Sequence, residues 1–196
     1  AVIAEVYGNL KAREGRSLRI VGTVYGDAEL KALPLVDLQN IRGNLTVKSL
    51  DSLRASRIGG NLQGSQVDGT LDVDRVGGNA LLDKVTGPLT IDQVAGNLVV
   101  VGLTGGSRVD RIGGNLVWNG DLGRGRTYQF RADGNATLRF SEGVGAHVTL
   151  RAGGNLHTSL ELADAEKGDS TLSGTVGDGG TEVAVDAGGN VLLGST

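Results

Sequence analysis

The stretch Gly77–Asn115 decides the fold, and it reads GGNALLDKVTGPLTIDQVAGNLVVVGLTGGSRVDRIGGN. It contains two turns of an 18-residue repeat. Each turn consists of two similar halves of nine residues with the pattern Gly-Asn-φ-x-φ-x-x-φ-x, in which φ is apolar. Asn79, Asn97 and Asn115 mark the starts of successive turns, and Pro88 stands at the equivalent point of a second half. A fixed short period of this kind is typical of repeat architectures.

The same anchor position can be followed along most of the chain. It is occupied by Asn9, Asp27, Asn44, Asn61, Asn79, Asn97, Asn115, Asn135, Asn155 and Asn190. Successive anchors are 18, 17, 17, 18, 18, 18, 20, 20 and 35 residues apart, and we read the last interval as two turns with a degenerate middle. We therefore expect about ten coils in a single domain over residues 1–196, regular over 43–119 and irregular over 120–187.

Apolar residues occupy fixed slots in each half-repeat. After Asn97 they are Leu98, Val100 and Leu103, at positions +1, +3 and +6, and the pattern recurs nine residues later in most turns. Alternation with a period of two indicates a β-strand with one buried face, and no window shows the spacing of an amphipathic helix. The sequence predicts an all-β fold: a single-stranded parallel β-solenoid, or β-helix, with coils of 17–20 residues and two nine-residue half-repeats per coil. Coils would stack at about 4.8 Å, and each would need its neighbours to bury its apolar row.

A Gly-Asn pair recurs at one corner of the predicted coil. Both residue types tolerate positive φ angles, so we expect the pair to form a turn. Asparagines stacked at one corner can also form a ladder of amide hydrogen bonds along the rod. The predicted ladder comprises Asn44, Asn61, Asn79, Asn97, Asn115, Asn135 and Asn155.

Composition narrows the possible function classes. The chain has 34 glycines, only six aromatic residues (Trp 1, Tyr 3, Phe 2) and no cysteine, which is unlike a conventional globular core and rules out disulfides. Its net charge of -3, with basic residues scattered among acidic ones, gives no footprint for nucleic acid. Because no run of 18 apolar residues occurs, we expect no direct membrane insertion by this segment.

No sequence motif indicates a catalytic, cofactor or metal site, so we expect a non-enzymatic protein without a cofactor. An outward column of Asp74, Asp92 and Asp110 could bind Ca²⁺ or act on a sugar, but we favour a charge ladder offset by neighbouring arginines. His147 and His157 are predicted on opposite sides of a coil, which argues against a shared metal site.

The few aromatic residues give little support to carbohydrate binding. Trp118 falls in an inward slot, and we expect it to fill the core where coils widen to 20 residues. Tyr7, Tyr25 and Tyr128 are too dispersed along the sequence to predict a sugar-binding platform. Carbohydrate is therefore not an expected partner.

Two kinds of self-association are predicted, one lateral and one through the ends. An outward patch of aliphatic residues should not face water uncovered, and it comprises Leu81, Val99, Val101 and Val117. Both ends of the chain read as ordinary coil without a cap, which would leave unpaired strand edges. The candidate residues for head-to-tail contact are Val2, Ile3, Val6, Val191, Leu192 and Leu193.

Residues Gly43–Asn155, in which G-N-φ-x-φ and G-x-φ-x-φ segments alternate, resemble the bacterial adhesin-like family of β-solenoid domains. They are similar, more loosely, to bactofilins, cytoskeletal proteins whose short β-solenoid polymerises end to end without nucleotide. Both resemblances imply a structural role, and neither supplies a catalytic motif.

The favoured hypothesis is a structural module of a bacterial envelope or extracellular protein that acts as an adhesin or scaffold and assembles end to end into filaments. Two alternatives stay open. One is a solenoid that binds carbohydrate or processes polysaccharide, and the other is a cytoplasmic bactofilin-like scaffold.

Overall fold

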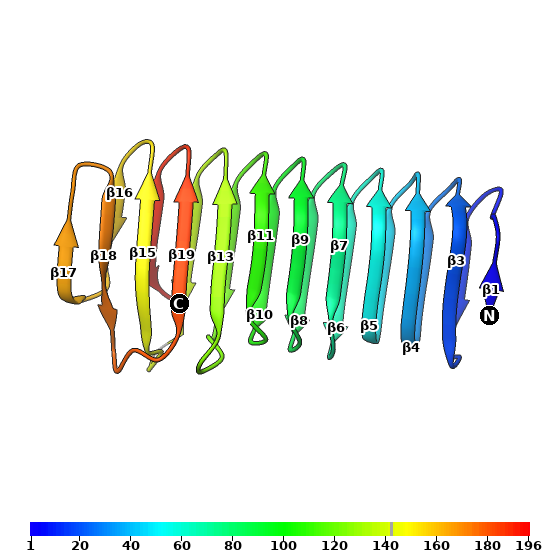
Figure 1. The fold of residues 1–196 in the computed structure, drawn as a ribbon, viewed down its shortest axis with the longest axis horizontal. Coiled ribbons are helices and arrows are strands. Elements are labelled where there is room, and N and C mark those ends of the chain that lie inside the picture. Colours follow the sequence, from blue (N-terminus) through cyan, green and yellow to red (C-terminus); the bar gives the residue numbers. More distant parts are fainter. Residues whose placement is uncertain (142) are drawn as a thin grey trace.

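The computed structural model describes residues 1–141 and 143–196, which contain strands and turns and no helix. Parallel coils stack into a long β-solenoid, which confirms the predicted fold class (Figure 1). The solenoid makes about eight turns, slightly fewer than the ten expected. The difference arises at the two ends. The first coil holds only the short strands β1 (Val2–Ile3) and β2 (Leu10–Arg13), and the last coil ends in a strand of three residues.

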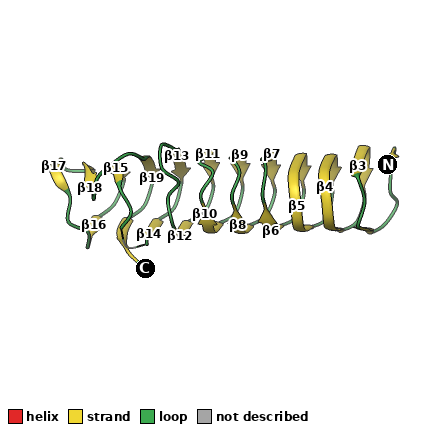
Figure 2. Cartoon of the chain, turned by 90° about the horizontal axis from the view of Figure 1, so that it is seen from below, coloured by secondary structure: helices red, strands yellow, loops and turns green. Residues whose placement is uncertain are grey.

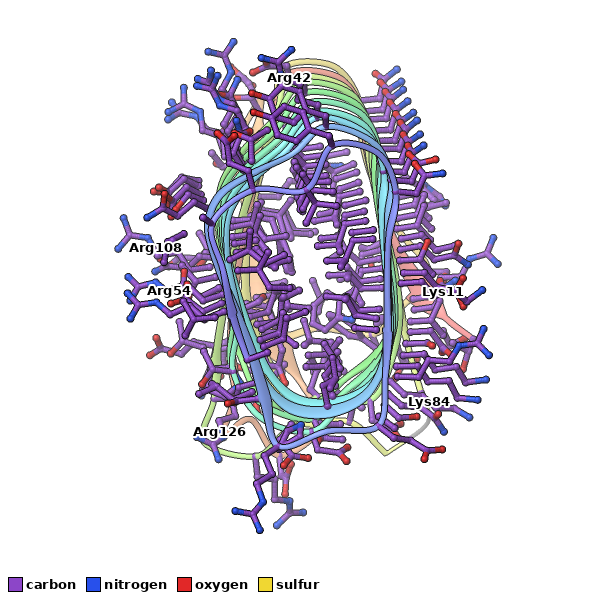
Figure 3. The ribbon with its side chains drawn as sticks, turned by 90° about the vertical axis from the view of Figure 1, so that its right-hand side faces the viewer. Lys11, Arg42, Arg54, Lys84, Arg108 and Arg126 are labelled. Carbon is purple, nitrogen blue, oxygen red and sulfur yellow. The ribbon has the colours of Figure 1, made fainter. Side chains whose placement is uncertain are left out.

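Two walls of strands enclose the interior of the rod, as the view along its axis shows (Figure 3). From the N-terminal end, the first face consists of β1, β3 (Ser17–Val24), the second part of β4 (Ala28–Ile41), the second part of β5 (Leu45–Ile58), β7 (Leu71–Val76), β9 (Leu89–Val94), β11 (Ser107–Ile112), β13 (Thr127–Ala132), β19 (Glu182–Ala187), β15 (Ala146–Ala152), β18 (Thr171–Val176) and β17 (Ala163–Lys167).

The second face contains the partner strand of each coil. It consists of β2, the first parts of β4 and β5, β6 (Leu62–Val67), β8 (Ala80–Val85), β10 (Leu98–Leu103), β12 (Leu116–Gly120), β14 (Ala136–Phe140), β20 (Val191–Ser195) and β16 (Leu156–Thr158).

Residues 18 apart lie directly above one another in the stack. Leu98 pairs with Ala80 on one side and with Leu116 on the other, in parallel strands and in register. Leu98 and Leu116 are completely buried, as are most residues in the inward slots. The core is therefore one continuous column of aliphatic side chains along the rod, and each coil completes the burial of its neighbours.

Close packing, and not a positive φ angle, explains the glycine at the asparagine corner. Gly96 does not adopt a positive φ, but a Cβ atom placed on it would lie 2.5 Å from Oδ1 of Asn79 and 2.9 Å from the carbonyl oxygen of Gly78. The side-chain amide of Asn79 thus packs directly against the Cα atom of Gly96 in the next coil. This corrects the expectation that Gly-Asn is chosen for its backbone freedom.

The opposite corner of the coil does use the left-handed backbone region. One residue in each of the first six coils adopts a positive φ there: Glu14, Ala32, Ser49, Gln66, Lys84 and Gly102. Each of the six lies five residues after a corner anchor, so their spacing follows that of the anchors. Only Gly102 is a glycine, so residue types at these positions do not predict this turn. The β-strands on either side hold the other five in a conformation that L-residues ordinarily avoid.

The last coil of the sequence is not the last coil of the rod. β19 pairs in parallel with both β13 and β15, and β20 pairs with both β14 and β16. Residues 182–195 are therefore inserted between the coil of β13 and β14 and the coil of β15 and β16. The C-terminus lies inside the length of the rod, away from its tip (Figures 1 and 2). The reading of the 35-residue interval as two consecutive turns was wrong, because the chain leaves the stack and returns one coil earlier.

An antiparallel hairpin closes the first face at the C-terminal tip. β18 pairs antiparallel with β15, and β17 pairs antiparallel with β18. This hairpin lies within residues 120–187, which were expected to be irregular. The expectation of two uncapped ends is therefore wrong for the first face at this tip. The second face stops at the three-residue strand β16, so the hairpin projects two strands beyond it.

An aromatic cluster fills the rod beside the inserted coil. Trp118 is fully buried, with its ring centroid 4.9 Å from that of Tyr128, 5.5 Å from that of Phe130 and 5.6 Å from that of Phe140. The predicted core position of Trp118 is correct. Burial raises the pKa of the Tyr128 hydroxyl, which accepts a hydrogen bond from the backbone of Gly123. Large side chains replace aliphatic ones where the coils contain 20 residues.

Candidate functional site

The corner asparagines are joined along the rod by hydrogen bonds with a single direction. The Oδ1 atom of Asn97 accepts from the backbone N–H of Asn115 at 2.8 Å and from its Nδ2 at 3.2 Å. The same two bonds link Asn97 to Asn79. At the inserted coil the order is Asn135, Asn190, Asn155: the backbone N–H of Asn190 donates to Asn135 and that of Asn155 donates to Asn190.

In the described residues this row begins in the coil of β1 and β2. The Oδ1 atom of Asn9 accepts from the backbone N–H of Asp27. In the same coil Ile3, Val6 and Leu10 are only half-buried, although the equivalent residues of the next coil are buried. Val2 is an outward residue and is 72% exposed. The inward apolar side chains of this coil are therefore less buried than those of the coils that follow.

The other half of the predicted end-to-end contact is not at an end. Val191, Leu192 and Leu193 belong to β20, between β14 and β16. Val191 and Leu193 are buried inside the rod, while Leu192 points outward and is 38% exposed. These three residues cannot form a contact at the tip, because a coil and the hairpin lie beyond them. This corrects the predicted site, and the cause is the insertion of the last coil.

The predicted lateral patch lies on the outer side of the second face. Leu81, Val99 and Val117 are in register on β8, β10 and β12, and Val101 lies in the neighbouring column. Leu81 is 44% exposed, Val101 is 38% exposed, and Val99 and Val117 are partly exposed. The inserted coil adds Leu192 to the column of Leu81, because Val117 pairs with Thr137 and Thr137 pairs with Leu192.

Charged residues line the outer side of the first face in columns that cross the strands (Figure 3). Arg108 donates to Asp110 at 2.7 Å, and this hydrogen bond lowers the pKa of the Asp110 carboxyl. In the neighbouring column Arg75 donates to Gln93 at 2.7 Å. Ion pairs between coils also form on this face, such as Arg111 with Asp133 at 2.8 Å. Because these groups are largely exposed, we expect each pair to contribute little to stability.

A polar groove of about 650 Å³ runs beside the asparagine corner near the N-terminal end. Its walls include Asn9, Asp27, Asn44 and Asn61 on one side and Lys11, Glu29, Thr46 and Gln63 on the other. Glu29 pairs with Lys11 at 2.7 Å and with Arg13 at 2.8 Å, and these hydrogen bonds lower the pKa of its carboxyl. The polar atoms here largely bind one another.

Two tyrosines that are distant in sequence stack on the surface. The rings of Tyr7 and Tyr25 are nearly parallel with centroids 5.0 Å apart, and the Arg42 guanidinium lies 4.5 Å from the centroid of Tyr25. Tyr7 is 81% exposed, and its hydroxyl donates to Glu5 at 2.7 Å. The expectation that these tyrosines are dispersed was wrong. Tyr25 follows Tyr7 by 18 residues and Arg42 follows Tyr25 by 17, and both spacings equal the coil period. This spacing was the signal that could have placed the three side chains in one column.

The two histidines lie on different faces. His147 is on β15, where its Nδ1 atom is 2.9 Å from the Thr175 hydroxyl, and His157 is on β16. Over residues 1–141 and 143–196 no group of three or more His, Cys, Asp or Glu side chains is arranged to bind a metal ion. The same residues contain no helix long and apolar enough to cross a membrane.

No family model, curated protein or solved structure matches the chain. Its class is therefore defined by its own geometry: a parallel β-solenoid repeat protein with a continuous aliphatic core. The distinctive surfaces of this solenoid are the half-buried apolar residues of the first coil, the apolar column on the second face and the exposed tyrosine stack.

Proposed function

We propose that this chain is a non-enzymatic structural module, a rigid β-solenoid that self-associates and acts as an adhesin-like or scaffold protein of a bacterial envelope or extracellular structure. The solenoid geometry supports a structural role. Hydrogen bonds between coils run along both faces and through the asparagine corner, so the coils have little freedom to move relative to one another. Twelve strands on the first face at about 4.8 Å give a rod of about 50 Å.

The half-buried apolar residues of the first coil, Ile3, Val6 and Leu10, support self-association through this end of the rod. An exposed strand edge with half-buried apolar residues is a template for another chain. The first coil and the segment before β3 bear Lys11, Arg13 and Arg16 against Glu5 and Glu14. The hairpin tip and the segment leading into it have the opposite balance, with Glu161, Asp164, Glu166 and Asp169 against Lys167. Opposite charges favour contact between the N-terminal end of one copy and the tip of another, a head-to-tail contact that repeats into filaments.

Charge reversal at the N-terminal end tests this proposal. The double variant Lys11→Glu, Arg13→Glu should shorten or abolish filaments in electron micrographs and lower the mass measured by light scattering. The matched control is Arg57→Glu, Arg75→Glu, which reverses two exposed charges in the middle of the first face. Assembly that is lost equally in both variants, or in neither, would contradict a contact through the N-terminal end.

Carbohydrate binding is a second candidate function, favoured by the Tyr7–Tyr25 stack alone. An exposed tyrosine ring backed by a second ring, with a carboxylate and a guanidinium alongside, provides an apolar platform and polar partners for a sugar. Glycan-array binding that disappears in Tyr7→Ala and persists in Tyr128→Phe would support it. A wild-type protein that binds no glycan would remove this candidate.

The proposed compartment, a bacterial envelope or the extracellular space, rests only on the resemblance to adhesin-like β-solenoid domains. Fractionation of the producing cells tests it, since recovery in the cytoplasm would favour the bactofilin-like alternative over an envelope or extracellular protein.

A further inference from the structure

We propose that a second copy of this chain packs against the apolar stripe of the second face, with the two rods antiparallel and related by a twofold axis that passes beside Val117. This inference deepens the proposed function, because it assigns one of the contacts by which the rod self-associates. The apolar stripe is defined as Leu81, Val99, Val117, Thr137 and Leu192.

The stripe is continuous across five neighbouring strands. Register places Leu81, Val99 and Val117 on β8, β10 and β12, followed by Thr137 on β14 and Leu192 on β20. All five point outward, and each keeps part of its surface exposed. Strands are about 4.8 Å apart, so the stripe is about 19 Å long. Four aliphatic side chains and one threonine methyl group in a row of this length form a surface that gains from being covered.

The order of residues along the stripe reads similarly from both ends. Gln63 precedes Leu81, and His157 follows Leu192, so polar residues bound the stripe on both sides. Val117 is at the centre of the stripe. Leu81 and Leu192 lie two strands from it on opposite sides, and Val99 and Thr137 lie one strand from it. A twofold axis beside Val117 therefore places each aliphatic residue against a residue of similar shape. Twofold contacts require this self-complementarity, because the same surface serves both copies.

The neighbouring outward column provides charge complementarity for the same arrangement. It contains Asp83 on β8, Val101 on β10, Asn119 on β12 and Arg139 on β14, and Gly194 on β20 completes it. When the rods are antiparallel, this column lies against the same column of the second copy in reverse order. Asp83 then lies opposite Gly194 of the second copy and diagonal to its Arg139. Gly194 has no side chain and is buried beside the Ser159 hydroxyl, so Arg139 on the adjacent strand is the charged side chain nearest to Asp83 of the second copy. Two such ion pairs would flank the apolar contact symmetrically.

A parallel arrangement of the two rods does not give this match. Rotation about an axis along the rod would bring the column of Asp83 and Arg139 of one copy against the asparagine corner of the other. The carboxylate and guanidinium would then face neutral amides. The distribution of charge therefore selects the antiparallel pair.

Sedimentation equilibrium of the full chain tests the contact. Val117→Lys places two cations against each other on the axis, and we expect it to weaken dimerisation at least about tenfold. Thr90→Lys on the first face is the matched control and should leave dimerisation unchanged. Thr137→Val completes the aliphatic row and should strengthen the dimer. Equal dimerisation of the wild type and Val117→Lys would overturn the proposal.

Charge exchange tests the orientation. Asp83→Arg and Arg139→Asp should each weaken the dimer, and the double variant should restore it, because the diagonal pair is then re-formed with reversed sign. Since the chain contains no cysteine, orientation can also be read by crosslinking. Leu81→Cys mixed with Leu192→Cys should give a disulfide-linked heterodimer. Homodimers of Leu81→Cys alone would show parallel rods and overturn the twofold axis proposed here.

The outcomes separate this contact from the proposed function. Assembly that is sensitive to Lys11→Glu, Arg13→Glu and insensitive to Val117→Lys would leave a self-associating rod and remove the stripe as its interface. A dimer sensitive only to Val117→Lys would support the stripe and remove the end contact. A chain that stays monomeric throughout would remove both.

Discussion

Asn97 and Gly96 show how two residues of one motif act on different coils. The Oδ1 atom of Asn97 accepts two hydrogen bonds from Asn115, while the bare Cα of Gly96 makes room for the amide of Asn79. A side chain at position 96 would collide with that amide. The recurrence of Gly-Asn therefore comes from a coupling between coils that no single turn would reveal.

Replacing Asn97 by Ala should lower the free energy of unfolding by about 1–2 kcal/mol, because the backbone N–H and the Nδ2 of Asn115 both lose their acceptor. Asn97→Asp is the matched control. Asp27 already holds the equivalent position and accepts both bonds from Asn44, so this variant should retain most of the stability. Urea unfolding followed by the fluorescence of Trp118, the single buried tryptophan, measures both. Equal losses in the two variants would show that the accepting oxygen is not what matters.

The strands β19 and β20 come last in the sequence and lie between earlier coils in the stack. The inward residues of β19 alternate with a period of two, as they do on β13 and β15, so this pattern does not decide on which side of β15 the strand lies. Val191 and Leu193 on β20 lie between Ala136 and Leu138 on one side and Leu156 and Thr158 on the other. The hairpin of β17 and β18 occupies the tip of the first face. The segment that follows it therefore joins the stack between β13 and β15.

Engineered cysteine pairs distinguish the inserted order from simple sequential stacking. Thr137 and Leu192 are direct neighbours, whereas Thr137 and His157 are separated by Leu192. Disulfides need Cα atoms about 4.4–6.8 Å apart, and two strand spacings come to about 9.6 Å. Thr137→Cys with Leu192→Cys should therefore oxidise readily, and Thr137→Cys with His157→Cys should not. The reverse result, read from mass spectrometry of proteolytic fragments, would show that the coils stack in the order of the sequence.

At the scale of the whole molecule, the rod behaves as a series of coils that contact only their neighbours. Leu62, Ala80 and Leu98 form one column, so the removal of the middle coil would bring Leu62 against Leu98 in the same register. The two nine-residue halves of a coil are less alike than two whole coils, because the two corners of a coil differ. One corner carries the asparagine row, and the other carries the residues of positive φ.

Deletion of the 18 residues 79–96 should therefore give a folded protein that is one coil shorter and unfolds cooperatively. Deletion of the nine residues 79–87 should lower the melting temperature further, by at least about 5 °C, because it moves all later asparagines to the other corner and interrupts the row. Circular dichroism during heating measures the two variants against each other. If both deletions melt alike, the difference between the corners has no energetic importance.

Much of this protein follows from the periodicity of its sequence. The spacing of Asn79, Asn97 and Asn115 and the alternation around them are enough to predict strands, coils and a buried aliphatic column, because each coil repeats the same contacts with its neighbours. The aliphatic patch on the second face follows from the same period, since the slots on either side of an inward residue must point outward. Trp118 could be placed in the core for the same reason.

Periodicity cannot decide the order of coils that share one pattern. Each coil buries equivalent side chains wherever it stands, so nothing local in residues 182–195 favours the tip over the interior. Only the tertiary structure shows that the hairpin of residues 163–176 occupies the tip and that Leu192 joins the stripe of Leu81. These arrangements depend on contacts between segments far apart in sequence, and such contacts are settled only when the whole chain has been stacked.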